Sequence, residues 1–159
     1  MDDRQFRNAM GKFVTGVTVI VTEVDGVEHG MTANAFMSVS LDPNLVVISL
    51  AEKAQMLGKI KRSKTFTVNI LADNQQELSM VFAGQKKEQQ EVVFDRLDGK
   101  PVIPGAVAQI ACEVSVEHVE GDHTLIIGKV TDIHLEESEP LIFYSGRYRS
   151  LSEAQPVIV

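Results

Sequence analysis

The chain has 159 residues, of which 44% are hydrophobic, and its 15 Lys and Arg against 22 Asp and Glu give a net charge of −7. Residues 1–159 fit a single domain, which can bury roughly 70% of its unfolded surface without disulfides or a metal. The negative charge argues against nucleic acid as a partner, and no apolar run approaches the roughly 20 residues that span a membrane.

Apolar and β-branched residues predict strands along most of the chain. The expected strands cover residues 14–22, 30–41, 45–50, 65–71, 110–118, 124–135 and 141–144. Apolar residues at helical spacing predict short helices over residues 3–11, from 55 onward, and over 73–84, with Asp3 and Asp73 as N-caps. Short strands joined by hairpin turns, such as one at Asp25-Gly26, favour a closed, mainly antiparallel barrel.

Two segments of the chain have a distinct composition. A polar run over residues 85–92 predicts a mobile surface excursion rather than a domain boundary. The first ten residues, MDDRQFRNAM, carry charges where a signal peptide needs an apolar stretch, so we expect a cytoplasmic protein.

The single cysteine, Cys112, has no partner for an internal disulfide and no second Cys for a metal or redox motif. Around it, apolar and polar residues alternate as in a half-buried strand, with Ile110, Cys112 and Val114 on the buried face. The same alternation places Glu113 and Glu117 in solvent. We therefore expect Cys112 to be a structural core residue.

The run GMTANAFMSVSLDP, from Gly30 to Pro43, is the most informative segment, because it is too polar for a core strand and too poor in Gly, Pro and Asp for a loop. Small side chains let another molecule approach the main chain, and Thr, Asn and Ser can bond a planar heterocycle or a phosphate. The small residues are Gly30, Thr32, Ala33, Ala35, Ser38 and Ser40. A ligand-binding strand is one interpretation, and a tightly packed barrel corner is the other.

Three further segments are candidates for ligand contacts. Ser49–Lys64 concentrates cations in an acidic chain, which suits a phosphate or pyrophosphate, although a solvated helix face has the same pattern. His123, on an expected turn after Gly121, can stack on a flat ligand or donate a hydrogen bond, although surface histidines in hairpins are common. Gly146–Arg149 offers an aromatic face and guanidinium donors, or it closes the end of the barrel.

Several catalytic motifs are absent from the sequence. It contains no GxGxxG, no P-loop, no GxSxG elbow and no His/Cys spacing typical of a metal site. The other histidines, His29, His118 and His134, have too little context for a role. Any catalysis is therefore expected to belong to a cofactor.

Seven short motifs occur in a fixed order: GVTV, GMTANAFMSVSLDP, SLAEKAQ, NIL, FAG, GDHTLIIG and GRY. This ordered set resembles the flavin reductase family of FMN-binding split barrels. The similarity is strongest to the small NADH-dependent reductase components of two-component hydroxylases that act on phenol or 4-hydroxyphenylacetate. It covers nearly the whole chain and ends before residues 152–159. The resemblance implies a six-stranded antiparallel Greek-key split barrel with a few short helices, which forms a homodimer with flavin near the subunit interface.

The resemblance also implies cofactors and site residues. FAD, or alternatively FMN, would accept a hydride at N5 from the nicotinamide C4 of NADH, and the reduced flavin would serve a separate oxygenase component. By similarity, Thr32, Ala33 and Asn34 would contact the ribityl chain and ring, and Ser38, Val39 and Ser40 would bond the isoalloxazine edge. Ser49 and Lys53 would contact the phosphates, and Phe82, Ala83 and Gly84 would border the same end of the flavin. His123, as the catalytic residue, and Tyr148 would lie beside the flavin ring and the nicotinamide, with Arg147 close by.

Three alternatives stay open at the level of sequence. A flavin-binding electron carrier or storage protein would share the flavin strand without a nicotinamide pocket, and the presence of His123 favours the reductase over it. An enzyme like pyridoxamine-phosphate oxidase also uses a split barrel, but the GDH, GRY and AEKAQ segments fit that group poorly. A non-enzymatic interaction barrel is the third alternative. The sequence does not decide whether the flavin is FAD or FMN, nor whether it stays bound or diffuses as a substrate.

Overall fold

The computed structural model describes residues 2–86 and 91–152, so residues 87–90 of the predicted surface excursion lie outside the described residues. The helices are α1 (Asp3–Met10), α2 (Gln55–Ser63) and α3 (Gln76–Phe82), the last preceded by a 3₁₀ turn, η1 (Asp73–Gln75). The strands are β1 (Thr15–Gly16), β2 (Thr18–Val24), β3 (Val27–Ala33), β4 (Phe36–Leu41), β5 (Asn44–Ala51), β6 (Thr65–Ile70), β7 (Asp95–Leu97), β8 (Lys100–Val102), β9 (Ala108–Glu120), β10 (His123–Leu135), β11 (Ile142–Tyr144) and β12 (Arg147–Arg149).

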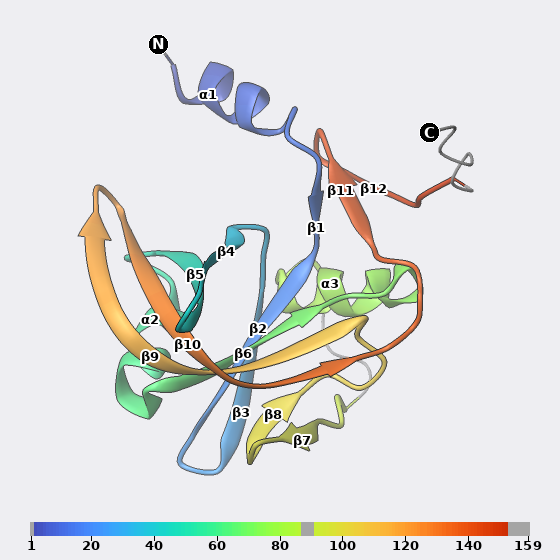
Figure 1. Cartoon of the computed structure of the whole chain (residues 1–159). Helices are drawn as coiled ribbons and strands as arrows, with labels where there is room; N and C mark the ends of the chain where they lie inside the picture. Colours follow the sequence, from blue (N-terminus) through green and yellow to red (C-terminus); the bar gives the residue numbers. More distant parts are fainter. Residues whose placement is uncertain (1, 87–90, 153–159) are drawn as a thin grey trace.

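Seven strands form one curled antiparallel sheet in the order β3-β2-β6-β9-β10-β5-β4. The long β9–β10 hairpin makes an arm on one side of the molecule (Figure 1). β3 and β4 follow each other in the chain but form the two edges of the sheet and are not hydrogen-bonded to each other. The mainly β, antiparallel architecture with short helices is as predicted. The large sheet, however, has seven strands rather than six, and it is open between β3 and β4 rather than closed.

Two smaller sheets complete the fold and differ from the prediction. The strand expected over residues 14–22 is interrupted at Val17, and its first part, β1, pairs with β11 in a three-stranded sheet, β1-β11-β12. The segment after Tyr144, expected to follow the last strand, instead makes the turn and second strand of the β11–β12 hairpin. The hairpin β7–β8 was not predicted; it turns at Asp98 and Gly99, both with positive φ.

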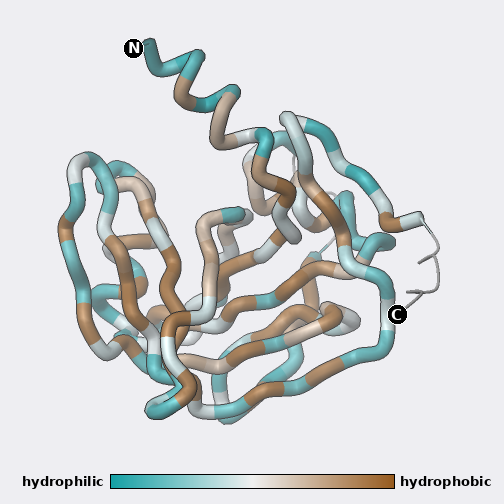
Figure 2. The backbone as a smooth tube through the Cα atoms, turned by 45° about the horizontal axis from the view of Figure 1, so that its top comes forward, coloured by the Kyte–Doolittle hydropathy of each residue, from teal (hydrophilic) through white to brown (hydrophobic). Residues whose placement is uncertain are grey.

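Two clusters of buried side chains occupy opposite faces of β2. The barrel core, inside the curled sheet and covered by α2, consists of Ile20, Val46, Ile48, Leu50, Met56, Leu57, Ile60, Phe66, Val68, Ile110, Cys112 and Ile126. The outer core, which packs against α3, β11 and β12, consists of Val17, Val19, Val21, Leu71, Ile103 and Leu141. Because successive residues of a strand point to opposite faces, β2 contributes to both cores and is buried from Thr18 to Thr22. Figure 2 shows the hydrophobic stretches along the strands of the body, with α1 projecting away from it.

The half-buried pattern predicted around Cys112 is wrong for the first part of β9. Gln109 and Ala111, on the face opposite Cys112, are also buried. The segment after β8 covers this face through buried hydrogen bonds: the Ile103 amide donates to Asn69 Oδ1 at 2.8 Å, and Gln109 Nε2 donates to the Ile103 carbonyl at 2.6 Å. These bonds satisfy polar groups that would otherwise destabilise the interior.

The helix starts also differ from the prediction. Asp2, rather than Asp3, is the N-cap of α1, because its side chain accepts a hydrogen bond from the Gln5 amide at 2.6 Å. Asp73 begins η1 instead of capping α3, which starts at Gln76. The buried face of α2 is as predicted and consists of Met56, Leu57 and Ile60. None of the helices in the described part of the chain is long and apolar enough to cross a membrane.

Cys112 is fully buried in the barrel core, as predicted, and burial raises the pKa of its thiol to about 12. The thiolate is the reactive form, so a thiol reagent at pH 8 should not label Cys112 in the folded protein and should label it completely in denaturant. Cys112→Ala should retain the reductase rate that the resemblance implies and lose about 1 kcal/mol of stability, measured by urea unfolding, because it removes one buried sulfur. Fast labelling of the folded chain would contradict a structural role.

Candidate functional site

The run predicted as one ligand-binding strand is in fact two strands, β3 and β4, separated by Asn34 and Ala35. The Phe36 amide donates to the Asn34 carbonyl at 3.0 Å, so the chain turns locally at this point. The Ser49 amide of β5 donates to the Ala35 carbonyl at 3.1 Å. The break therefore brings the end of the Thr32–Asn34 segment next to Ser49, two positions that were predicted to contact the same ligand.

β4 carries an irregularity at Val39. Ser38 pairs with Val46 and Ser40 pairs with Leu45, so Val39 has no partner in the β4–β5 register. A bulge leaves main-chain groups unpaired and re-aims side chains, and bulges are frequent next to binding sites. Because β4 is also an edge strand and Ser38 and Val39 are exposed, this edge offers main-chain donors and acceptors to a ligand.

The end of β5 lies beside the β9–β10 turn. His123, predicted to lie in that turn, is the first residue of β10, where it pairs with Ala51. The Glu52 amide donates to the Asp122 carbonyl at 2.9 Å, which ties the segment carrying Lys53 to the turn. The tertiary structure thus brings together Lys53 and His123, which the sequence places in two separate motifs.

His123 is oriented by its neighbour Asp122. Its Nδ1 lies 2.7 Å from Asp122 Oδ1, and 45% of its side chain is exposed. The hydrogen bond from His123, together with the nearby charges of His123 and Lys53, lowers the pKa of the Asp122 carboxyl. The ionised carboxylate accepts the Nδ1–H, which leaves the other ring nitrogen, Nε2, free for a ligand.

The basic segment Ser49–Lys64, which contains α2, is not a uniform patch of charge. Three of its cations pair with carboxylates at 2.9–4.0 Å: Arg62 with Asp25, and Lys61 and Lys64 with the half-buried Glu117. Glu117, predicted to face solvent, is therefore part of an ion-pair cluster. These three cations fit the interpretation of a solvated helix face, which leaves Lys53 and Lys59 as candidates for a phosphate.

Contacts of α3 hold several predicted site residues in place. The Thr32 hydroxyl donates to the Ser79 carbonyl at 2.7 Å, and the Ser79 and Tyr148 hydroxyls lie 2.8 Å apart. A Cβ built on Gly30 would lie 2.5 Å from the Phe82 ring, so the close approach that Gly30 permits is made by the protein's own side chain. Tyr148 also packs edge-on against Phe143 with ring centroids 5.4 Å apart, which supports its alternative role in closing one end of the barrel.

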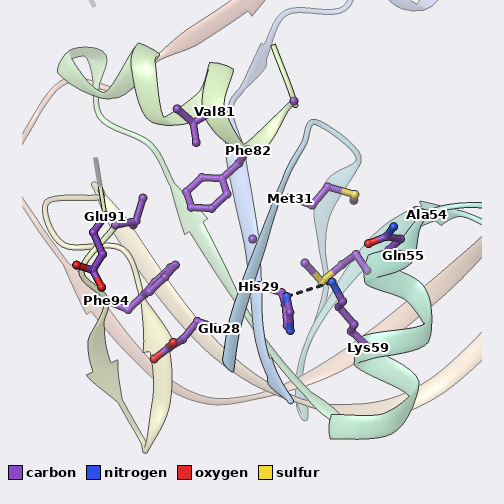
Figure 3. A pocket seen from close by; sticks show the side chains of 14 residues that line it. Glu28, His29, Met31, Ala54, Gln55, Lys59, Val81, Phe82, Glu91 and Phe94 are labelled. Atoms are coloured by element: carbon purple, nitrogen blue, oxygen red, sulfur yellow. Dashed lines mark hydrogen bonds between the residues drawn. The ribbon is translucent and has the colours of Figure 1, made fainter. Parts of the chain in front are cut away.

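A cavity of about 520 Å³ opens on β3 between α2, α3 and the segment before β7 (Figure 3). Its lining includes Phe82 and Gly84 of the predicted site. His29 Nδ1 and Lys59 Nζ, 3.1 Å apart, project into it from β3 and α2. Burial and the nearby Lys59 lower the pKa of His29, so its imidazole is neutral at physiological pH. Ala83 follows α3 directly and is exposed.

Not all of the predicted residues meet within one chain. His123 lies at the tip of the β9–β10 arm, whereas the β11–β12 hairpin with Arg147 and Tyr148 lies on the other side of the molecule (Figure 1). Arg147 is exposed. A single chain therefore separates His123 from the two residues predicted to share the nicotinamide with it.

Comparison with known proteins gives the family. Residues 10–152 match the model of the flavin reductase like domain. The chain belongs to this flavin reductase-like family. It is 44% identical over 148 residues to an NADH-dependent flavin reductase of Rhodococcus sp, covering 91% of this chain and 84% of that protein. It is also 36% identical over 147 residues to the reductase component of 4-hydroxyphenylacetate 3-monooxygenase from Thermus thermophilus, covering 92% of this chain and 95% of that protein.

The solved structure of the flavin reductase PheA2 in its native state superposes on this member of the flavin reductase-like family with a TM-score of 0.94 at 60% identity, covering 96% of this chain and 100% of that one. The family predicted from the ordered motifs is thereby confirmed. Nothing in the sequence indicated that His29 and Lys59 are paired. Lys59 lies three residues after the buried Met56, and residues three apart share a helix face. This spacing was the one sequence signal that Lys59 lies near the buried face of α2.

Proposed function

We propose that this chain is an NADH-dependent flavin reductase that transfers a hydride from NADH to FAD or FMN and supplies the reduced flavin to a separate monooxygenase. The observation that carries the proposal is similarity to NADH-dependent flavin reductases and hydroxylase reductase components over more than nine tenths of the chain. Residues 1–159 act as one domain in this proposal. The free thiol of the buried Cys112 suits a reducing cytoplasm.

The residues of the structure fit a flavin. The bulged edge of β4 offers unpaired main-chain groups to the isoalloxazine edge, and the break after β3 lies next to it. Lys53 is exposed and has no carboxylate within 4.0 Å among the described residues, so its ammonium is available for a phosphate. We assign flavin contacts to Thr32, Ala33, Asn34, Ser38, Val39, Ser40, Ser49, Lys53, Phe82, Ala83 and Gly84.

The protein's task in this reaction is positioning. Bound flavin supplies the hydride acceptor, so the reaction needs no protein acid or base. Alignment of two reactants in one site is worth about 7–11 kcal/mol in the best intramolecular models. We assign His123 to the nicotinamide, because Asp122 orients its ring and leaves Nε2 available for a ligand. Arg147 and Tyr148 are assigned to the same end of the site.

The test is a visible spectrum of the purified protein with added FAD or FMN, followed by anaerobic addition of NADH. We expect a perturbed flavin spectrum on binding and bleaching of the flavin absorbance with one equivalent of NADH. Binding of flavin without NADH oxidation would instead show an electron carrier or storage protein. A folded preparation that binds no flavin would favour an interaction barrel.

We also propose that the chain forms a homodimer. Large apolar side chains are exposed near α1 and along the edge strand β4, namely Phe6, Met10, Phe13, Val14, Met37, Val39 and Leu41. Leu41 and Phe13 are 90% and 78% exposed, which is costly in a monomer when the neighbours are also apolar. A second copy would also complete a site in which His123 and Tyr148 come from different chains.

Light scattering at micromolar concentration should therefore report twice the mass of the 17.5 kDa chain. Phe13→Asp with Leu41→Lys should shift the protein to the monomer, because charges at an apolar interface lose their hydration. The double variant Val27→Asp with Val93→Lys, at other exposed apolar positions, serves as the control and should leave the mass unchanged. A wild-type monomer would refute the assembly.

A further inference from the structure

The cavity of Figure 3 has an aromatic end and a cationic end. Phe82 and Phe94 line one end, with ring centroids 6.3 Å apart and ring planes tilted by 47°. His29 and Lys59 line the other end. The volume of about 520 Å³ lies within the roughly 300–1,000 Å³ of small-molecule sites. An aromatic wall with a cation beyond it suits a ligand that carries an aromatic base and a phosphate.

Lys59 is the cation of α2 that remains available to such a ligand. Lys61, Arg62 and Lys64 all pair with carboxylates, whereas no carboxylate of the described residues lies within 4.0 Å of the Lys59 ammonium. Its partner is the imidazole of His29, which accepts one of its three N–H groups and leaves two for an anion. Because Lys59 is half-buried, its charge acts at a lower dielectric than that of its exposed neighbours.

The two acidic residues of the cavity, Glu28 and Glu91, do not pair with Lys59. Glu28 is bound by Arg96, with Nη2 and Oε1 2.7 Å apart. Glu91 is exposed at the side of the cavity that Phe94 lines. Carboxylates there would repel a second phosphate but accept hydrogen bonds from ribose hydroxyls or from the amino group of a base. The donor and acceptor pattern thus matches adenosine more closely than it matches a bare anion.

The cavity also continues the site assigned to flavin. Ala54 and Gln55 line it and directly follow Lys53, and Phe82 and Gly84 belong to both. We propose that Lys59, positioned by His29, binds a phosphate in the adenosine diphosphate half of a dinucleotide, so that this cavity distinguishes FAD from FMN. The proposal rests on the proposed function for the identity of the flavin. FAD and NADH both carry this half, so the experiment must separate them.

Dissociation constants of FAD, FMN, ADP and NAD⁺ should be measured by calorimetry for the wild type, Lys59→Ala and Lys61→Ala, with NAD⁺ added to FMN-loaded protein. Lys59→Ala should weaken FAD and ADP about 10- to 100-fold, which is the usual loss for a charge-assisted contact, and leave FMN within twofold. Lys61→Ala removes the same charge from the same helix and should change none of them more than twofold. Lys59→Arg should restore most of the affinity.

The role of His29 is tested by a double-mutant cycle. His29→Ala should weaken FAD less than Lys59→Ala does, and the double variant should be no worse than Lys59→Ala alone, because His29 acts through Lys59. The imidazole resonances of His29 in the wild type should shift on addition of ADP, which has no ring to reduce, and not on addition of FMN. Independent, additive losses would overturn the positioning role.

The remaining outcomes distinguish FAD from NADH as the ligand of the cavity, and they distinguish failure of the subsite from failure of the proposed function. Loss of NAD⁺ affinity with unchanged FAD affinity in Lys59→Ala would retain a subsite for the adenosine diphosphate half of the nicotinamide dinucleotide, but it would overturn the role of this cavity in distinguishing FAD from FMN. An equal loss of affinity for FAD and FMN in Lys59→Ala, or unchanged affinity for all adenosine ligands, would overturn the subsite. A wild type that binds ADP but no flavin would defeat the proposed function and leave the subsite intact. Variants are compared only where their circular dichroism matches the wild type.

Discussion

His123→Ala is expected to lower kcat/KM for NADH by roughly ten- to hundredfold, which corresponds to about 1–3 kcal/mol of transition-state stabilisation. The ring of His123 is held by Asp122 at 2.7 Å and is 45% exposed at the tip of the β9–β10 hairpin. If this ring orients the nicotinamide, its removal misaligns the hydride donor while the flavin keeps its own contacts. Flavin affinity, measured by fluorescence titration, should change by less than about twofold.

A matched control is available on the same strand. His134 is 50% exposed and its Nε2 lies 3.0 Å from Glu136 Oε1, so its environment resembles that of His123. His134→Ala should leave the rate unchanged. Chemical reduction of bound flavin by dithionite should also be unaffected in both variants, because it bypasses the nicotinamide. Stopped-flow reduction by NADH at the wild-type rate in His123→Ala would return this residue to the class of ordinary surface histidines.

Gly128→Ala should cost about 1–3 kcal/mol of stability, although it adds one methyl group. An added Cβ would lie 2.5 Å from the para carbon of the Phe66 ring and 3.0 Å from the Cβ of Cys112. Both side chains are completely buried in the barrel core, so neither can move without displacing other packed groups. For a chain of this size the melting temperature should fall roughly 2–4 °C for each kcal/mol.

A second substitution tests the cause of this loss. Phe66→Leu removes ring atoms next to the added methyl group, so it should recover part of the stability lost in Gly128→Ala, whereas it destabilises the wild type. Gly58→Ala is the control: it lies in α2 with no atom within 4 Å of the added Cβ, and it should stabilise by up to about 1 kcal/mol. Equal effects of the two glycine substitutions on the melting temperature would exclude overpacking at Gly128.

Elements with a strong local period were predictable from sequence. The helix α2 follows from the spacing of Met56, Leu57 and Ile60, and the turn at Asp25-Gly26 follows from two residues that tolerate positive φ. The buried position of Cys112 likewise follows from alternation. Each of these signals lies within a few neighbouring residues and needs no knowledge of the partner strand.

Features that depend on distant partners were missed. The break at Asn34 and Ala35 is stabilised by a hydrogen bond from Ser49 of another strand. Because no local signal marks this break, the sequence predicted β3 and β4 as one strand. Gln109 looks like the solvent-facing residue of an alternating strand, and only the segment around Ile103 makes it a buried one. The hairpin β7–β8 has three residues in each strand, too few for a periodic signal.

The site shows the same division. The motif order determined the family and led to the residues proposed for a flavin site, because the motifs depend on local chemistry such as small side chains, hydroxyls and a histidine near a turn. The tertiary structure decided which cations form ion pairs and which face a cavity, since charge pairing depends on distances between segments. Lys59 and Lys61 are two residues apart in one helix; only Lys61 lies near Glu117, and only Lys59 meets His29.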